Sequence, residues 1–228
     1  HIKFNFIANC AFAEYAILDP KLMIGMPPKL TAFTGLDALT HAVEGYTGTL
    51  TNGYVQFFAE KTMDTIAQYL PRAVADGKDL EARGKMAVAS NVAGFLLIYG
   101  HTNAGHSIGQ TIGGYFNIPH GAACAYAEPW VLEYNAPAVP ELTKRVGEAL
   151  GATFTGKETP EEIGTIVRKA FIHFRDVDCK MPSIKTFSFD ESKFDEVADA
   201  CAKEFFQQFN AKKMEKADCL RILQNMYA

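Results

Sequence analysis

Apolar positions recur with a helical period along most of the chain. The clearest series follows Pro27–Pro28, a pair that suits the first turn of a helix. Its apolar members, spaced near the helical period, are Leu30, Phe33, Ala38, Leu39, Ala42, Val43 and Tyr46. The pattern therefore predicts a helix that begins at Pro28 and reaches about residue 46.

Start and stop signals predict more helices farther along. Asp79 is a good N-cap, Thr159–Glu162 is a capping box, and Pro71 favours the end of a helix. The predicted ranges are about 55–69, 79–99, 159–175, 190–209 and 216–227. A further helix should hold His106 and end at Gly113–Gly114, and another should begin at His120. About eight helices result, with no hairpin signal.

The first residues carry a different pattern. The apolar run Ala11–Leu18 stops at the turn signal Asp19–Pro20, so part of it is predicted to be a strand. No second strand is predicted to pair with it, and an isolated strand hints at an absent sheet. The expected fold is one mainly α domain with a short strand attached.

Composition and charge exclude several classes of protein. The 228 residues are 48% hydrophobic and 21% charged, which is ordinary for a soluble globular protein. The net charge of −4 gives no support for binding nucleic acid or an anionic membrane surface. The five cysteines form no CxxC pair, which is typical of reduced thiols in a cytoplasmic protein.

One long segment has no charged side chain. No Asp, Glu, Lys or Arg occurs from Met86 to Ala127, a stretch of 42 residues. Polar residues and glycines interrupt it, so it is not a membrane helix. Three of the six histidines, including His106 and His120, lie inside it. We therefore expect an interior segment that contributes to a site.

Four residues could bind one metal ion. Asp37 and His41 are four apart and share a helix face. His106 and His120 flank a tight turn, across which their imidazoles can converge. One carboxylate and three imidazoles suit Fe²⁺, Zn²⁺ or Mn²⁺ and leave positions open for a substrate oxygen. The alternative is a loose capping box around Asp37 and histidines that bond backbone carbonyls.

The segments around these residues resemble a known family. Gly35–Glu44 and Gly105–Gly121 look like the two signatures of the iron-containing (group III) alcohol dehydrogenases, including the 14-residue step from His106 to His120. Weaker similarities are Leu18–Leu22, Met26–Pro28, Asp79–Arg83 and Leu220–Leu223. The resemblance extends from about Tyr15 to the C-terminus.

The resemblance implies a fold and a reaction. The family joins an α/β domain, which binds NAD or NADP, to a helical domain that binds the metal. Residues 1–20 would then be a remnant of the cofactor domain, and residues 21–228 the metal- and substrate-binding domain. The chain shows no GxGxxG motif, so it is expected to be inactive alone.

The resemblance also implies particular site residues. The metal, Fe²⁺ or alternatively Zn²⁺, would be held by Asp37, His41, His106 and His120. Leu22 matches a cofactor contact. The implied substrate is a small alcohol or aldehyde.

Two residues depart from the family pattern. Gln110 stands where many members carry a second histidine, and glutamine cannot relay a proton near neutral pH. Glu128 stands where an apolar residue is common, and we interpret it as a salt-bridge partner in preference to a substrate-facing group. Cys124 is interpreted as a buried packing thiol.

Two alternative functions remain open, and the sequence also predicts a partner for the chain. A non-catalytic metal-binding helical module and a zinc-type polyol dehydrogenase of the same superfamily remain alternatives. An uncharged face near Leu22, Met23, Ile118 and Trp130 predicts a homo-oligomer or an associated N-terminal domain.

Overall fold

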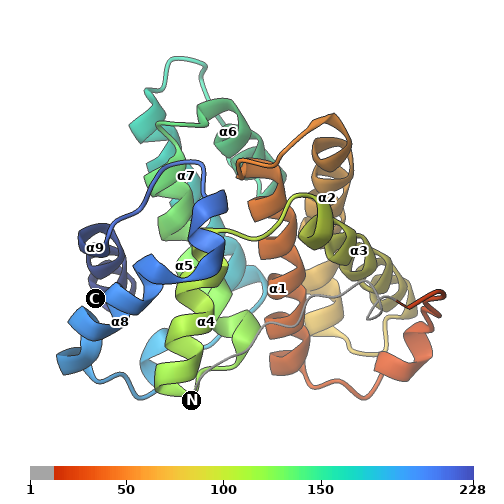
Figure 1. Ribbon diagram of the computed structural model, residues 1–228. Coiled ribbons are helices and arrows are strands. Elements are labelled where there is room, and N and C mark those ends of the chain that lie inside the picture. Colours follow the sequence, from red (N-terminus) through yellow and green to blue (C-terminus); the bar gives the residue numbers. More distant parts are fainter. Residues whose placement is uncertain (1–12) are drawn as a thin grey trace.

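A computed structural model describes residues 13–228 of the chain as helices and loops, without a strand in that range (Figure 1). The nine α-helices of this range are α1 Pro28–Thr47, α2 Gly53–Ala75, α3 Leu80–Tyr99, α4 Ala104–Phe116, α5 His120–Asn135, α6 Pro140–Ala149, α7 Pro160–His173, α8 Phe194–Lys203 and α9 Lys216–Tyr227. The expected mainly α fold is confirmed.

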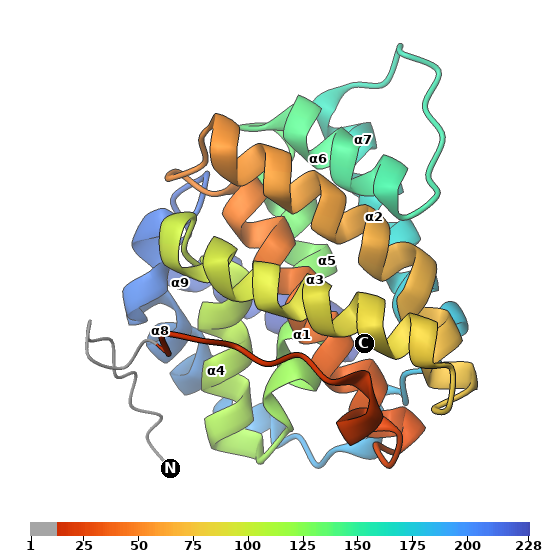
Figure 2. The same ribbon diagram turned by 90° about the vertical axis from the view of Figure 1, so that its right-hand side faces the viewer.

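Helix α1 lies at the centre of the molecule. It packs against α2 and α3 on one side and against α5 on the other, and α4 lies alongside α5 (Figures 1 and 2). Most of its apolar side chains are buried, among them Leu36, Leu39 and Val43, whereas Leu30 in the first turn is exposed. Because neighbouring helices cover much of α1, several of its polar residues, such as Thr40 and Glu44, are buried in protein.

The predicted caps at the beginning of α3 and α7 are present in the structure. Asp79 accepts a hydrogen bond from the Ala82 N–H at the beginning of α3. Thr159 and Glu162 form the reciprocal bonds of a capping box at the beginning of α7. Side-chain oxygens thus satisfy backbone N–H groups that have no partner inside the helix.

The predicted C-terminal ends of the helices are less accurate. Helix α2 continues through Pro71 to Ala75, because Leu70, Ala73 and Val74 are buried in the core. Helix α4 passes Gly113–Gly114 and ends at Phe116, followed by Asn117, which has a left-handed backbone. Burial of a helix face outweighs these local stop signals.

Three other predictions need correction. Helix α6, a ten-residue helix that begins at Pro140, is not among the predicted helices. The range 190–209 is not one helix, because the extended backbone of Glu204 separates α8 from the 3₁₀ turn Phe205–Phe209. After His173, α7 gives way to a π-helical turn, Phe174–Asp178.

The predicted strand is not found where the structure can be described. Residues 11 and 12 lie outside the described range, and residues 13–19 have no regular secondary structure. A short 3₁₀ turn, Pro20–Met23, follows and contacts α3.

None of the helices between residues 13 and 228 combines the length and apolar character that crossing a membrane requires.

Candidate metal centre

Four potential metal ligands converge from three helices. Asp37 comes from α1, His106 from α4, and His120 and Cys124 from α5. One donor atom from each lies within 4.8 Å of the others. The Asp37 Oδ1 atom is 3.8 Å from His106 Nε2 and 3.5 Å from His120 Nε2. The structure thus brings together three of the four predicted ligands.

The helical register explains how α5 supplies two donors. His120 and Cys124 are one turn apart and therefore share a face. The Cys124 Sγ atom lies 3.8 Å from both ring nitrogens of His120. Cys124 is buried, as predicted, and its sulfur also lies among the potential metal ligands.

His41, the fourth predicted ligand, lies beside this group. Its ring stacks on that of His106, with centroids 4.5 Å apart. Desolvation by the surrounding protein lowers the pKa of His41 to about 3, with the nearby His106 as the next cause. His41 is therefore neutral at pH 7 and keeps a nitrogen lone pair, as a metal ligand requires.

The donor set fits a divalent transition metal. Bonds of about 2.0–2.3 Å place neighbouring ligand atoms about 3–4 Å apart, depending on the geometry. The separations of 3.5 and 3.8 Å around Asp37 Oδ1 agree with that range. Imidazole and carboxylate suit iron and zinc, and a thiol among the donors favours zinc.

Comparison with known proteins identifies the family. The family described as "Fe-containing alcohol dehydrogenase family, C-terminal" matches residues 31–227. The chain belongs to this family. The predicted resemblance to iron-containing alcohol dehydrogenases is thereby confirmed.

The sequences of individual relatives support this family assignment. The chain is 42% identical over 162 residues to choline dehydrogenase of Bacillus subtilis, covering 70% of this chain and 40% of the relative. It is 40% identical over 160 residues to 1,3-propanediol dehydrogenase of Klebsiella pneumoniae, covering 69% and 41%. The chain therefore spans about two fifths of the length of these curated relatives.

Solved structures share the fold. A 1,3-propanediol oxidoreductase superposes with a TM-score of 0.85 at 32% identity, over 91% of this chain and 54% of that one. An alcohol dehydrogenase from Oenococcus oeni gives a TM-score of 0.85 at 31% identity, with the same coverage. The helical arrangement around the candidate centre is thus that of iron-type alcohol dehydrogenases.

Next to the potential metal ligands, Glu44 holds His106. The Glu44 carboxylate accepts a 2.9 Å hydrogen bond from the His106 backbone N–H. It is also in close contact with the Nδ1 atom of the His106 ring. This contact leaves Nε2 on the side of Asp37. Burial raises the pKa of Glu44 to about 7, and backbone N–H groups at the start of α4 oppose the rise. A partner on the second ring nitrogen fixes the orientation of a metal-ligating histidine.

Sequence reasoning did not assign this role to Glu44. The signal was present, because Glu44 follows His41 by three residues and shares the α1 face of Asp37 and His41. Only the packing of α4 against α1 shows that His106 meets that face.

Glu128 behaves differently from the expectation. It is buried beside Glu44; within residues 13–228 it forms no salt bridge, and its Oε2 atom has no hydrogen-bond partner there. Burial raises its pKa, and the neighbouring Glu44 carboxyl raises it further. The interpretation as a salt-bridge partner is therefore wrong. A buried carboxyl without a partner costs free energy of folding.

We expect Glu128→Leu to stabilise the fold. Removing the unpartnered carboxyl should raise the free energy of unfolding by about 1–2 kcal/mol in urea titrations. Glu44→Leu is the matched control, because it removes the acceptor of the His106 N–H and should lower that free energy. A loss of stability in Glu128→Leu equal to that in Glu44→Leu would contradict this account.

Two other predicted site residues lie outside the group of potential ligands. Gln110 is half-buried on α4, one turn after His106. Leu22 is 83% exposed. It lines a hollow of about 430 Å³ together with Met23 and Met26. An exposed apolar side chain at the edge of a hollow is available for a flat ligand.

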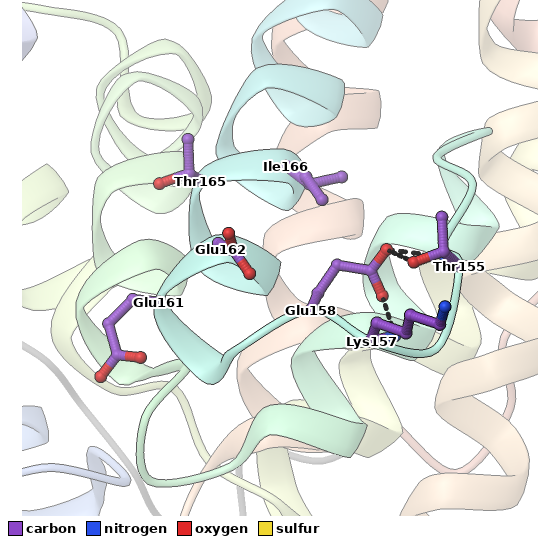
Figure 3. A pocket seen from close by; sticks show the side chains of 7 residues that line it. All are labelled: Thr155, Lys157, Glu158, Glu161, Glu162, Thr165 and Ile166. Carbon is purple, nitrogen blue, oxygen red and sulfur yellow. Dashed lines mark hydrogen bonds between the residues drawn. The ribbon is translucent and has the colours of Figure 1, made fainter.

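A larger hollow of about 530 Å³ lies at the start of α7, far along the chain from the metal centre (Figure 3). Glu158 there accepts hydrogen bonds from the backbone N–H groups of Thr155 and Gly156, at 2.7 and 2.9 Å. These bonds and the Thr155 hydroxyl lower the pKa of Glu158 to about 2. The carboxylate stabilises its own loop, so we assign no chemistry to this hollow.

Proposed function

We propose that this chain is the metal- and substrate-binding part of an NAD(P)-dependent alcohol dehydrogenase. The observation that carries the proposal is the convergence of Asp37, His106 and His120 at ligand distances, in a chain of the iron-containing alcohol dehydrogenase family. The names of relatives, choline and 1,3-propanediol dehydrogenase, support a small hydroxyl-bearing substrate.

Asp37, His41, His106 and His120 are the proposed ligands of Fe²⁺. A bound divalent ion supplies Lewis-acid polarisation of the reacting carbon–oxygen group. Asp37 contributes a negative charge, and Glu44 orients the His106 ring. The residues from Met86 to Ala127 bring no charged side chain to the site, so electrostatic interactions there are weakly screened.

The hydride acceptor is a nicotinamide nucleotide carried by an α/β domain. The proposal assigns residues 1–20 to that domain and residues 21–228 to the metal- and substrate-binding domain. The exposed Leu22, at the edge of its hollow, is the proposed contact with the cofactor. A cytoplasmic location is also proposed, since the buried Cys179, Cys201 and Cys219 are free thiols.

A zinc-type polyol dehydrogenase is the second candidate. The observation in its favour is the Cys124 sulfur among the donors, because thiolate ligands favour zinc over iron. Elemental analysis after purification under reducing, anaerobic conditions distinguishes the two, since zinc would predominate in this case.

The function is tested by reduction of NAD(P) in the presence of primary alcohols and diols. We expect a longer chain that includes the α/β domain to reduce NAD(P) with Fe²⁺ bound, and His106→Ala in that chain to be inactive. The 228-residue chain alone should bind the metal without turnover. Turnover by this chain alone, or undiminished turnover in His106→Ala, would contradict the proposal.

A further inference from the structure

A small hollow lies between α5 and α9, and none of the four potential metal ligands lines it. Its volume is about 230 Å³. Sites for drug-sized ligands measure roughly 300–1,000 Å³, so this hollow suits a smaller molecule. Two aromatic rings and two cations are among its lining side chains, namely Trp130, Tyr134, Lys212 and Arg221. We call these four residues the α5–α9 site.

Hydrogen bonds fix the segment that carries Lys212. The buried side-chain amides of Asn135, on α5, and Asn210 bond each other reciprocally at 2.7 and 2.9 Å. Asn210 also donates to the Lys212 carbonyl oxygen at 2.7 Å. One residue later, the Lys213 carbonyl oxygen accepts a 2.6 Å bond from the Tyr134 hydroxyl. The backbone is thus tied to α5 on both sides of the Lys212 side chain, so a ligand there would not have to order the loop.

Two side chains give the site a positive charge. The Lys212 ammonium lies 4.1 Å from the centroid of the Tyr134 ring and forms no salt bridge within residues 13–228. Arg221 pairs with Asp218 at 3.0 Å through one nitrogen of its guanidinium, and its side chain is 59% exposed. A bound anion could therefore receive charge-assisted hydrogen bonds from both cations.

The acidic side chain in the wall does not cancel this charge. The Glu133 Oε2 atom pairs with the Arg168 Nε atom at 3.0 Å. The Glu133 Oε1 atom accepts a 2.9 Å hydrogen bond from the Thr165 hydroxyl. Side chains of α7 thus engage both oxygens of Glu133, and the charge of Lys212 remains available to a ligand.

Trp130 differs from the expectation drawn from the sequence. Ile118 is buried in the core, and the Arg168 guanidinium lies 4.5 Å from the centroid of the Trp130 ring. The predicted face of Leu22, Met23, Ile118 and Trp130 is therefore not a continuous apolar surface. The Trp130 ring is instead one wall of a hollow that cations also line.

We propose that the α5–α9 site binds a small planar carboxylate, such as an aromatic acid. The carboxylate would accept hydrogen bonds from Lys212 and Arg221, and the flat apolar part would lie beside the Trp130 and Tyr134 rings. The site shares no residue with the potential metal ligands, so the proposal does not depend on the proposed alcohol dehydrogenase function.

Benzoate is the probe for this site, added to the full chain after a chelator has removed bound metal. Trp130 is the single tryptophan of the chain, so its indole N–H resonance reports directly on the hollow. Benzoate should shift this resonance saturably, with a Kd on the order of 1 mM. Benzamide, which has a similar shape without the charge, should bind at least about 5-fold more weakly. Lys212→Met and Arg221→Met should each weaken benzoate binding about 5-fold, because each removes one cation.

Lys213→Met is the matched control. Lys213 is adjacent to Lys212 in the chain, but its side chain is 87% exposed, pairs with Glu215 and does not line the hollow. This variant should bind benzoate like the wild type, and circular dichroism checks that all three variants remain helical. An indole resonance that benzoate does not shift saturably would overturn the proposal, and so would equal binding of benzamide. Unchanged benzoate binding in both Lys212→Met and Arg221→Met would also overturn it, since the carboxylate would then lie elsewhere.

Discussion

Replacing His106 or His120 with alanine is expected to remove most of the bound metal. Each substitution deletes one imidazole from a donor group whose members lie within 4.8 Å of one another. Losing a partner of a ligand typically lowers metal affinity 10–100-fold, so losing a ligand should lower it by at least about 100-fold. The measurement is the metal content of each variant after dialysis against a competing chelator.

His173→Ala is the control for this experiment, because the His173 side chain is 65% exposed at the end of α7 and is not a member of the donor group. Its metal content should equal that of the wild type. Full metal content in both His106→Ala and His120→Ala would exclude the proposed centre.

The same measurement distinguishes His41 from Cys124 as the fourth donor. We expect His41→Ala to lose metal and Cys124→Ala to retain it, because the neutral His41 ring can turn from its stack on His106. The reverse result would assign the fourth position to the Cys124 sulfur, which already lies among the donors. Circular dichroism of both variants excludes unfolding as the cause.

Gly121→Ala is expected to cause the largest loss of stability. A Cβ atom at this position would lie 2.2 Å from the Phe33 carbonyl oxygen and 3.0 Å from Asp37 Cβ. Because the two nearest obstructing atoms, the Phe33 carbonyl oxygen and carbon, belong to the α1 backbone, α1 and α5 must move apart. We expect the free energy of unfolding to fall by about 3 kcal/mol, and the melting temperature by about 6–12 °C.

Gly94→Ala is the matched control for Gly121→Ala. It also lies inside a helix, but a Cβ atom there would meet nothing within 4 Å. Alanine has the higher helix propensity, so this variant should gain about 0.5–1 kcal/mol. Metal affinity should fall only in Gly121→Ala, since Asp37 and His120 flank that contact. A Gly121→Ala protein as stable as the wild type would show that the two helices can separate without cost.

The helices and the ligand types could be predicted from local sequence. The apolar period of α1, the N-cap at Asp79 and the capping box at Thr159 act within a few residues, so the sequence alone reveals them. The spacing of Asp37 and His41 likewise depends only on the helical repeat. The family signatures then indicated which histidines belong with them.

The helix ends and the missed α6 depended on contacts farther apart in the chain. Pro71 is a local stop signal, yet α2 continues because its last turns bury Leu70 and Val74 in the core. A propensity of a few kcal/mol at most yields to the burial of a whole helix face.

By itself, the sequence determined a helical protein with an aspartate and histidines suited to one metal ion. Only the tertiary structure decided that Cys124 lies among the potential donors and that Glu44 holds His106. Tertiary packing further decided that Glu128 has no ionic partner among the described residues 13–228. It also decided that the exposed apolar rings lie on α2 and α3 and not beside Ile118. The physical reason is that these relations join residues on different helices. Helical periodicity fixes the face that each residue occupies, whereas the packing of α1, α4 and α5 fixes which faces meet.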